Sequence, residues 1–180
     1  MKCSRCDQKA IYYNNNEYFC KDHFIQYYEN KVLETIEKYK LIKSGDKIGV
    51  GVSGGKDSNA LMFFLNKYKD YFNIEVFGIH IDEGIKRYRT KNTEFLLKIA
   101  KKYGWKIKIY KFKDYFGYEL DEIVKNIKEI KPCTICGVFR RWLMWKASID
   151  LNLTKIATAH NLNDEIQTIF MNIFENNMKD

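Results

Sequence analysis

The sequence predicts an α/β fold, a doubly wound parallel sheet preceded by a small zinc knuckle, and three observations support this prediction. Short apolar runs alternate with helical patterns from Lys47 onward, which is typical of βαβ units. The connections between these segments are short, as in parallel sheets that are covered by helices. The first 23 residues instead hold three cysteines and a histidine around a turn signal, which is typical of a small metal-binding module.

The composition is that of a packed globular chain. Its 180 residues are 46% hydrophobic and 30% charged, with ten glycines and one proline, and this length corresponds to about 1.2 domains. We therefore expect a knuckle over residues 1–30 and one main domain over residues 31–180. The longest stretches without a charged side chain have nine residues, whereas a membrane span needs about 20. The N-terminal residues also lack the apolar core of a signal peptide, so we expect a cytoplasmic protein without a membrane partner.

The charge balance leaves RNA binding open. A net charge of +8 favours a polyanionic partner, but many cytosolic proteins are basic without touching nucleic acid. Most aromatic residues lie in apolar periodic runs and are expected in the core rather than on a base-stacking surface.

The N-terminal part is predicted to form a turn followed by a long helix. Asn14–Asn16 is a turn signal between two aromatic patches. From residue 23 to residue 42 the pattern is helical, because apolar residues recur every fourth position from Phe24 to Ile36. Ser44–Asp46 is expected to end this segment before the first strand of the main domain.

The remainder alternates between predicted strands and predicted helices. Strands are predicted at Lys47–Val52, Ile74–Ile81, Trp105–Phe112 and Thr154–Thr158. Helices are predicted at Asn59–Tyr68, Thr93–Tyr103, Tyr118–Ile130, Val138–Leu151 and Asp164–Phe174. Gly104 is expected to close one helix from the position after its end, and Pro132 is expected to stop the helix that precedes it.

Two half-sites near the N-terminus predict a structural zinc site. Cys3-x-x-Cys6 is followed after thirteen residues by Cys20-x-x-His23. Each half places two soft ligands on one tight turn, so the four side chains can close a tetrahedron around zinc at about 2.0–2.3 Å. Four protein ligands leave no open position, and the segment holds too little apolar material to fold without metal.

A glycine-rich turn between a predicted strand and a predicted helix is the candidate phosphate site. Its residues are Ser53, Gly54, Gly55, Lys56, Asp57 and Ser58. Glycines let backbone N–H groups approach a phosphate closely, and the helix N-terminus adds partial positive charge. The serine hydroxyls can donate hydrogen bonds, Lys56 can neutralise a phosphate oxygen, and Asp57 can orient Mg²⁺ or cap the helix. The spacing differs from the G-x-x-x-x-G-K-[ST] pattern of the P-loop.

A second cysteine pair, Cys133 and Cys136, follows Pro132 and precedes a predicted helix. The proline holds the turn rigid, and the positive end of the helix dipole favours the thiolate form, which binds metal or carries sulfur. A redox pair and one half of a metal site that a partner completes are both compatible with this spacing.

Four motifs together resemble the TtuA/NcsA family of tRNA 2-thiolation enzymes, within the N-type ATP pyrophosphatase (PP-loop) superfamily. The first is the Ser53–Ser58 loop, which resembles the pyrophosphate-binding loop of that superfamily. The second is Pro132-Cys133-Thr134-Ile135-Cys136-Gly137 with Arg140-Arg141, and the third is the segment Ala157–Thr168. The N-terminal set of three cysteines and one histidine is the fourth. The resemblance covers the whole chain and implies an adenine-nucleotide α-hydrolase-like fold.

The resemblance also implies a reaction and its cofactors. ATP transfers AMP to the C2 oxygen of a tRNA uridine with release of pyrophosphate, and a sulfur nucleophile then displaces AMP to give 2-thiouridine or 2-thioribothymidine. Mg²⁺ accompanies ATP, Zn²⁺ is structural, and a [4Fe–4S] cluster binds the sulfur, with a cysteine persulfide as the older interpretation. Sulfide or a ubiquitin-like sulfur-carrier protein is the implied donor, and a homodimer is among the assemblies that the sequence leaves open.

The same motifs imply the site residues. Catalytic roles are implied for Lys56, Cys133, Cys136 and Asp164, the last in Mg²⁺ binding or proton transfer. ATP contacts are implied for Ser53, Gly54, Gly55, Lys56, Asp57, Ser58, His80, Ile81, Arg140 and Ala159. The backbone of His80 and Ile81 would contact adenine, and the side chain of His80 is equally compatible with strand packing. Cys133 and Cys136 are the implied cluster ligands, whereas Arg141 and Lys146 are expected at tRNA phosphate or on a solvated face.

The chain departs from the family pattern at several points. Ala159 stands where the family usually has glycine, and Asn163 stands where it often has aspartate. The family also has a third cysteine and a second zinc knuckle beyond this length, whereas no cysteine follows Cys136 here. We therefore expect a truncated chain or a shortened paralogue. The alternatives are another PP-loop enzyme that adenylates tRNA, such as a lysidine-type ligase, and a non-catalytic zinc module that binds RNA.

Overall fold

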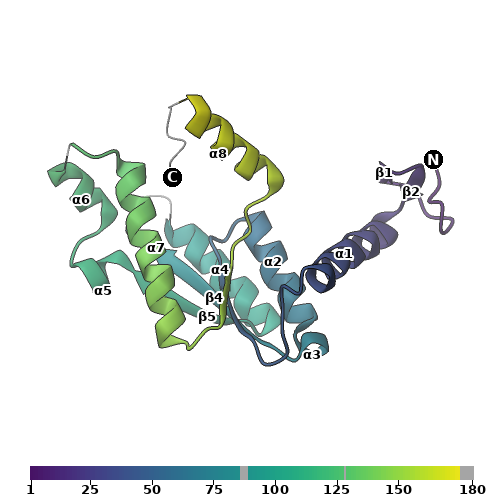
Figure 1. Ribbon diagram of the computed structural model, residues 1–180, viewed down its shortest axis with the longest axis horizontal. Coiled ribbons are helices and arrows are strands. Elements are labelled where there is room, and N and C mark those ends of the chain that lie inside the picture. Colours follow the sequence, from purple (N-terminus) through teal and green to yellow (C-terminus); the bar gives the residue numbers. More distant parts are fainter. Residues whose placement is uncertain (86–88, 128, 175–180) are drawn as a thin grey trace. The chain divides into compact units, whose positions relative to one another are not determined.

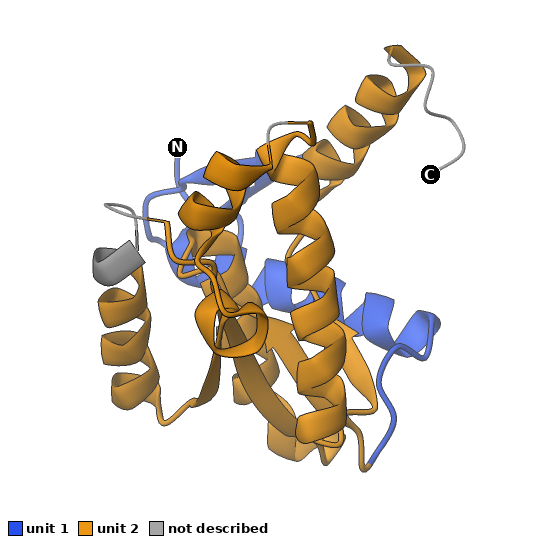
Figure 2. Cartoon of the chain, turned by 90° about the vertical axis from the view of Figure 1, so that its left-hand side faces the viewer, with its two compact units in different colours: residues 1–44 blue, residues 45–180 orange. Residues whose placement is uncertain are grey.

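Figure 1 shows the computed structural model of the chain, which describes residues 1–85, 89–127 and 129–174. The chain divides into two compact units, Met1–Ser44 and Gly45–Asp180, which Figure 2 shows in different colours. In this division the long first helix belongs to the same unit as the N-terminal cysteine-containing segment. The domain boundary after residue 30 remains a prediction, because a division by contacts does not identify an independently folding domain.

The N-terminal unit consists of a short hairpin and one long helix. Strands β1 (Tyr12–Asn14) and β2 (Glu17–Phe19) pair in the antiparallel sense. Asn15 and Asn16 connect them with φ angles of 48° and 64°, a left-handed conformation that asparagine adopts more readily than most residues. Helix α1 (Lys21–Lys38) follows directly, so it begins slightly earlier and ends earlier than the sequence pattern predicts.

The second unit is built on a four-stranded parallel sheet. The predicted strands are confirmed as β3 (Lys47–Gly51), β4 (Glu75–Asp82), β5 (Lys106–Lys111) and β6 (Lys155–Ala157). They lie in the order β5-β4-β3-β6. The chain thus moves outward from β3 to β5 and then returns to the other side of β3. In doubly wound sheets, such a reversal of strand order marks the crevice where ligands bind, beyond the carboxyl ends of the strands.

Helices cover both faces of this sheet, which confirms the doubly wound prediction. They are α2 (Lys56–Lys67), α3 (Lys69–Phe72), α4 (Arg89–Tyr103), α5 (Phe112–Phe116), α6 (Leu120–Asn126), α7 (Pro132–Asp150) and α8 (Leu162–Phe174). On one face, a Cβ atom at Gly78 would lie 3.4 Å from Met62 of α2. On the other face, Ile79 packs in one cluster with Leu143 of α7. Figure 1 shows α7 on one side of the sheet and α2 with α4 on the other.

A group of buried apolar side chains packs together between the sheet and α7. Its members are Ile79, Ile81, Tyr110, Phe112, Leu120, Ile123, Ile135, Leu143 and Ala147. Three of them recur along one face of α7, as an amphipathic helix requires. Helix α8 is different, because none of its residues is buried, and its apolar side chains, among them Ile169, Phe170 and Phe174, are exposed.

Several helix boundaries in the second unit differ from the prediction, and those of α7 and α6 differ most clearly. Helix α7 begins at Pro132 rather than at Val138, because proline is favourable in the first helical turn, where its missing N–H has no intrahelical partner. Helix α6 ends at Asn126, and residue 128 of the longer predicted helix lies outside the described residues. The short helix α5 begins where the lysine-alternating pattern of β5 predicts more strand. Among the described residues, no helix combines the length and the apolar character that crossing a bilayer requires.

Candidate functional site

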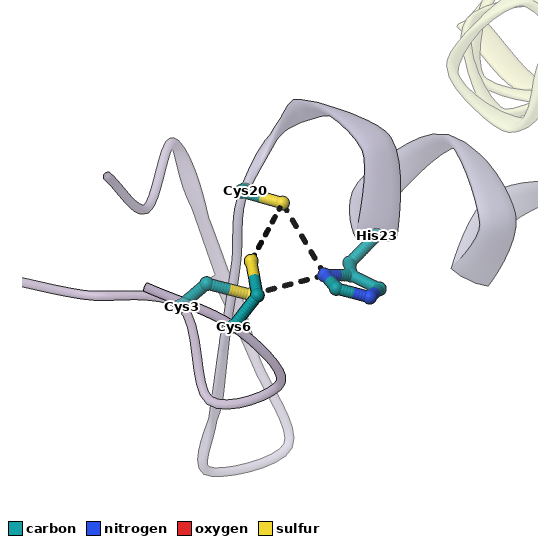
Figure 3. A group of neighbouring side chains, drawn as sticks. All are labelled: Cys3, Cys6, Cys20 and His23. Atoms are coloured by element: carbon teal, nitrogen blue, oxygen red, sulfur yellow. Dashed lines mark hydrogen bonds between the residues drawn. The ribbon is translucent and has the colours of Figure 1, made fainter. Parts of the chain in front are cut away.

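The N-terminal unit brings the four predicted zinc ligands together. Cys3 and Cys6 lie on the loop before β1, Cys20 lies directly before α1, and His23 lies in the first turn of α1. Figure 3 shows all four side chains pointing into one small space. Their ligand atoms lie within 4.8 Å of one another.

The distances suit a tetrahedral zinc ion. Bond lengths of about 2.3 Å to sulfur and about 2.0 Å to nitrogen place ligand sulfurs about 3.8 Å apart and sulfur and nitrogen about 3.5 Å apart. The sulfurs of Cys6 and Cys20 are 3.7 Å apart. The Nδ1 atom of His23 lies 3.4 Å from the sulfur of Cys3 and 3.3 Å from that of Cys20. The donor set and its geometry therefore fit zinc.

The environment of the thiols also favours metal binding. Burial raises the pKa of Cys3, but the surrounding hydrogen bonds, among them the backbone N–H of Arg5, outweigh it and lower this pKa to about 6. The pKa of Cys6 is raised, because burial and the neighbouring Cys20 outweigh a hydrogen bond from the backbone of Gln8. Metal binding requires thiolates and displaces the remaining thiol protons. Cys3 and Cys20 are buried, with 7% and 1% of their surface exposed, as expected for a structural site.

In the second unit, the candidate phosphate loop joins β3 to α2. Gly54 has a φ of 84°, and a Cβ atom there would lie 3.3 Å from the backbone oxygen of Asn92. Glycine is therefore required at this position both by backbone conformation and by space. The loop follows a strand and opens a helix, as the sequence predicts.

Hydrogen bonds within the loop hold its shape. The hydroxyl of Ser58 donates to the backbone oxygen of Gly55 at 3.1 Å and accepts from the backbone N–H of Ser53 at 3.3 Å. The side-chain amide of Asn59 donates to the backbone oxygen of Gly54 at 3.1 Å. Ser58 is buried, so these hydrogen bonds are made within the protein and fix the turn of the loop.

The start of α2 offers donors for an anion. Its N-cap residue is Gly55, and no side chain caps this end of the helix. The first N–H groups of a helix have no intrahelical acceptor and carry the positive end of the helix dipole. Lys56 and Asp57 are exposed in the same turn. This arrangement fits a phosphate group, with Lys56 as the cation beside it.

His80 connects the phosphate loop to a neighbouring helix. Its Nδ1 atom lies 2.8 Å from the backbone oxygen of Val52, and its Nε2 atom lies 3.0 Å from the hydroxyl of Thr93. The carbonyl can only accept, so Nδ1 carries the proton and donates. His80 is buried, with 5% of its surface exposed, and the side chain of Ile81 is buried in the core. Both side chains thus pack inside the fold, and the contact of their backbone with adenine stays a prediction.

Arg140 has a partner that sequence reasoning missed. Its Nε atom lies 3.5 Å from Oε1 of Glu83, whose side chain is only 10% exposed. Glu83 directly follows β4, and its backbone oxygen accepts from the N–H of Leu120 at the start of α6. The signal that could have identified Glu83 is its position, because an acidic residue immediately after a parallel strand lies at the edge where ligands bind.

The Cys133–Cys136 pair lies in the first turns of α7 rather than before the helix. Cys133 is exposed, and Cys136 is half-buried against the core. Cys133, Cys136 and Arg140 are spaced i, i+3 and i+7, which places them on one face of the helix. Iron–sulfur clusters usually need three or four thiolates, so these two residues fit only part of such a site and do not complete it.

Asp164 lies after β6, at the start of α8. Its carboxylate accepts from the backbone N–H of Asn161 at 2.8 Å, while the Asn161 side chain accepts from the backbone N–H of Asp164 at 3.2 Å. This reciprocal pair is a capping box that satisfies the first donors of α8. Ala159 is half-buried in the preceding segment. Asp164 therefore caps the N-terminus of α8, independently of any part that it takes in the reaction.

The topology brings these groups to one edge of the sheet. The Ser53–Ser58 loop follows β3, Glu83 follows β4, and Ala159 follows β6, so all lie beyond carboxyl ends of parallel strands. Helix α7 leads back to the start of β6, and its contact with Glu83 shows that its first half lies at the same edge. The reversal of strand order between β3 and β6 is where a nucleotide would bind in a doubly wound sheet.

Comparison with known proteins identifies similar sequences and structures. A family model described as the PP-loop domain matches residues 25–180. A tRNA-5-methyluridine(54) 2-sulfurtransferase of Pyrococcus horikoshii is 40% identical over 96% of this chain and 54% of its own length. A cytoplasmic tRNA 2-thiolation protein 1 of Chlamydomonas reinhardtii is 35% identical over 95% of this chain and 49% of its own.

A solved structure matches over the whole fold. The U34-tRNA thiolase NcsA from Methanococcus maripaludis, with its [4Fe–4S] cluster, superimposes with a TM-score of 0.87 and 37% sequence identity. The match covers 99% of this chain and 59% of that one. The chain therefore spans about half the length of the curated relatives it matches.

Proposed function

Because this chain belongs to the PP-loop domain family, we propose that it contributes the nucleotide-binding and sulfur-transfer part of an ATP-dependent tRNA uridine 2-sulfurtransferase. One observation carries the proposal. The glycine-rich phosphate loop and an exposed cysteine at the start of α7 belong to elements that meet at one edge of the parallel sheet. The relatives named as tRNA thiolating enzymes support the choice of tRNA as substrate.

In the proposed first step, the C2 oxygen of uridine attacks the α-phosphorus of ATP. The bond between the α-phosphorus and the bridging oxygen breaks, and pyrophosphate leaves with the electron pair. The protein contributes mainly position and charge, as phosphoryl-transfer enzymes generally do. The N–H groups at the start of α2 and the Lys56 ammonium would hold the leaving pyrophosphate. Arg140, kept at the sheet edge by Glu83, would offset further phosphate charge.

In the proposed second step, sulfide attacks the C2 carbon at the Cys133–Cys136 face of α7. The carbon–sulfur bond forms, the bond from C2 to the adenylated oxygen breaks, and AMP leaves with that oxygen. The proton of the sulfide passes to solvent or to a nearby base, and no oxidant is needed. If a ubiquitin-like carrier protein delivers the sulfide, the same bonds form and break in this step. Asp164 is the proposed ligand of the Mg²⁺ that accompanies ATP, or a proton acceptor.

The metal assignments follow the donor sets. We assign zinc to Cys3, Cys6, Cys20 and His23, where it would stabilise the N-terminal unit without taking part in chemistry. A [4Fe–4S] cluster would supply an open iron that binds sulfide, but Cys133 and Cys136 alone fall short of its ligand count. The steps above therefore involve only residues of this chain, ATP with its Mg²⁺, the tRNA uridine and sulfide. A cytoplasmic location is proposed from the relative of that name.

Mass spectrometry of tRNA nucleosides tests this function. A deletion strain should lack 2-thiouridine or 2-thioribothymidine, and the affected position distinguishes a wobble from a T-loop target. Cys133→Ser should fail to restore the thiolated nucleoside, whereas Thr134→Ser, an exposed neighbour on the same turn, should restore it. Thiolation that survives Cys133→Ser would instead favour a different tRNA-adenylating enzyme. If ATP with Mg²⁺ gave no thermal shift, a non-catalytic zinc module that binds RNA would be favoured.

A further inference from the structure

Helix α7 carries a row of contacting aromatic rings that the proposed chemistry does not use. Its members are Phe116 of α5 and Phe139, Trp142 and Trp145 of α7, which we call the aromatic track. The rings of Phe116 and Phe139 stack with centroids 4.2 Å apart and planes at 23°. The centroids of Phe116 and Trp142 are 5.3 Å apart, and those of Trp142 and Trp145 are 6.1 Å apart.

The outer half of the aromatic track is open to solvent. The two tryptophans of α7, Trp142 and Trp145, are 40% and 55% exposed, whereas Trp105, the third tryptophan of the chain, is only 8% exposed. Large aromatic side chains normally supply buried surface, so neighbouring exposed tryptophans mark a surface where something binds.

The inner end of the track opens into a pocket. Its lining is mostly apolar and consists of Phe116, Tyr118, Ile123, Asn126, Ile127 and Phe139, around a volume of about 370 Å³. The side-chain amide of Asn126 supplies a hydrogen-bond donor and an acceptor to this lining. A flat ring with polar edges, such as a nucleobase, suits both the stacked aromatic wall and the single amide.

The charge around the track is positive. Residues 125–146 contain six lysines and arginines but only one acidic residue. Arg141 is exposed one position before Trp142 and forms no ion pair within the part of the chain that the structure describes. Aromatic side chains interleaved with cations are the arrangement by which proteins bind single-stranded nucleic acid, since the bases stack while the cations attract the phosphates.

We propose that the aromatic track binds unpaired bases of RNA. One base would enter the pocket between α6 and α7, and the following bases would stack on Trp142 and Trp145. The proposal rests on the proposed function for the choice of RNA as partner, because that function requires an unpaired uridine near the Cys133–Cys136 face. The cysteines and the track share one helix, since Phe139 lies one turn after Cys136.

Binding of a labelled oligouridine of about ten nucleotides, long enough for one stacking groove, tests the proposal by fluorescence anisotropy. Trp142→Leu and Trp145→Leu should each weaken binding about tenfold, because leucine keeps apolar surface but loses the ring that stacks on a base. Trp142→Phe should retain most of the affinity. Tyr71→Leu, which changes an even more exposed aromatic residue on α3, should have no effect. An RNA duplex of the same length should bind the leucine variants and the wild type alike.

Two outcomes would overturn the proposal. If the leucine variants bound oligouridine as well as the wild type does, the bases would not stack on the track. If sedimentation showed a dimer that buries Trp142 and Trp145, the track would be a protein interface. ATP binding measured on the same variants separates this failure from failure of the function. Intact ATP binding and thiolation with unchanged RNA affinity in the leucine variants would reject only the track. If the wild type itself failed to thiolate tRNA while the leucine variants bound RNA more weakly, only the sulfurtransferase assignment would be rejected.

Discussion

The guanidinium of Arg140 meets the carboxylate of Glu83 at 3.5 Å, across the end of β4. The side chain of Glu83 is nearly buried, whereas that of Arg140 is 53% exposed. The carboxylate is therefore held inside the fold, and the guanidinium lies at the surface. This pair ties α7 to the carboxyl edge of the sheet. It also keeps a positive charge on the helix face that carries Cys133 and Cys136.

Replacing Glu83 by glutamine should weaken ATP binding without unfolding the protein. The amide keeps the shape of the side chain but no longer holds Arg140 electrostatically, and we expect roughly a threefold to tenfold loss of ATP affinity. The free energy of unfolding should fall by about 1 kcal/mol or less, because the arginine is half exposed. Calorimetric titration with ATP and Mg²⁺ measures the first effect. Glu17→Gln, which breaks the exposed pair with Arg5, is the control, and equal ATP affinity for both variants would contradict a positioning role for Glu83.

Gly54→Ala should abolish phosphate binding. The new Cβ atom would lie 3.3 Å from the backbone oxygen of Asn92 at a φ of 84°, and the left-handed conformation alone costs about 1–2 kcal/mol. Gly45→Ala is a matched control, since Gly45 has a φ of 86° and no atom within 4 Å of the added Cβ. Both variants should lose stability in urea through the left-handed conformation, Gly54→Ala somewhat more because of its contact with Asn92, but only Gly54→Ala should lose the thermal shift that ATP produces. Retained ATP binding by Gly54→Ala would argue against this loop as the phosphate site.

Two substitutions at Asp164 separate its capping task from any catalytic one. Asp164→Ala removes the acceptor for the backbone N–H of Asn161 and should destabilise α8 by about 1 kcal/mol. Asp164→Asn keeps an acceptor oxygen and should retain the helix content measured by circular dichroism. Thiolation should be lost in both variants. If Asp164→Asn were fully active, the carboxylate charge would have no part in Mg²⁺ binding or proton transfer.

The two cysteine sites should respond differently to substitution. Cys20→Ser should release zinc and unfold the N-terminal unit, because the site lacks a second source of stability. Cys133→Ser should leave the zinc content at about one ion per chain, which four-ligand geometry predicts. Elemental analysis of the purified variants gives the answer. Zinc loss from Cys133→Ser with retention in Cys20→Ser would mean that the assignments are reversed.

Glu75 should make stability depend on pH in the acid range. Hydrogen bonds from Lys47 of β3 and Lys106 of β5 lower the pKa of this carboxylate of β4. Because the folded-state pKa lies below the unfolded-state value, the stabilisation is present above the unfolded-state value and is lost as the pH falls through the folded-state value. Glu75→Gln should therefore lower the urea midpoint at neutral pH but not in acid. Glu94→Gln, an exposed acidic residue of α4, should change neither midpoint, and a pH-independent effect of Glu75→Gln would exclude the ionic origin.

The parts of the fold that follow from local sequence were predictable. The four strands, and the loop from Ser53 to Ser58, are contiguous segments whose pattern of glycines, apolar runs and helix signals determines their conformation. The same holds for the zinc ligands, because each half-site lies within four residues. The start of α7 was less predictable, since Pro132 is compatible with ending one helix and with beginning the next.

The contacts that complete the candidate site depend on tertiary structure. Glu83 and Arg140 are far apart in sequence, and only the crossing of α7 over β4 brings them together. The side chain of His80 was a candidate for either ligand binding or packing. Its hydrogen bonds to Val52 and Thr93 depend on the register between β3 and β4 and on the placement of α4. Neither relationship leaves a periodic signal in the sequence.

The exposure of α8 has a consequence for hydrogen exchange. This helix of thirteen residues buries none of them, and isolated helices shorter than about 12–15 residues are marginal in water. Its capping box at Asn161 and Asp164 is the main local support within the described residues. Backbone amides of α8 should therefore exchange with deuterium orders of magnitude faster than those of α7, whose Leu143 and Ala147 are fully buried. A ligand that covers the apolar side of α8 would be detected as slowed exchange there, before any change in secondary structure.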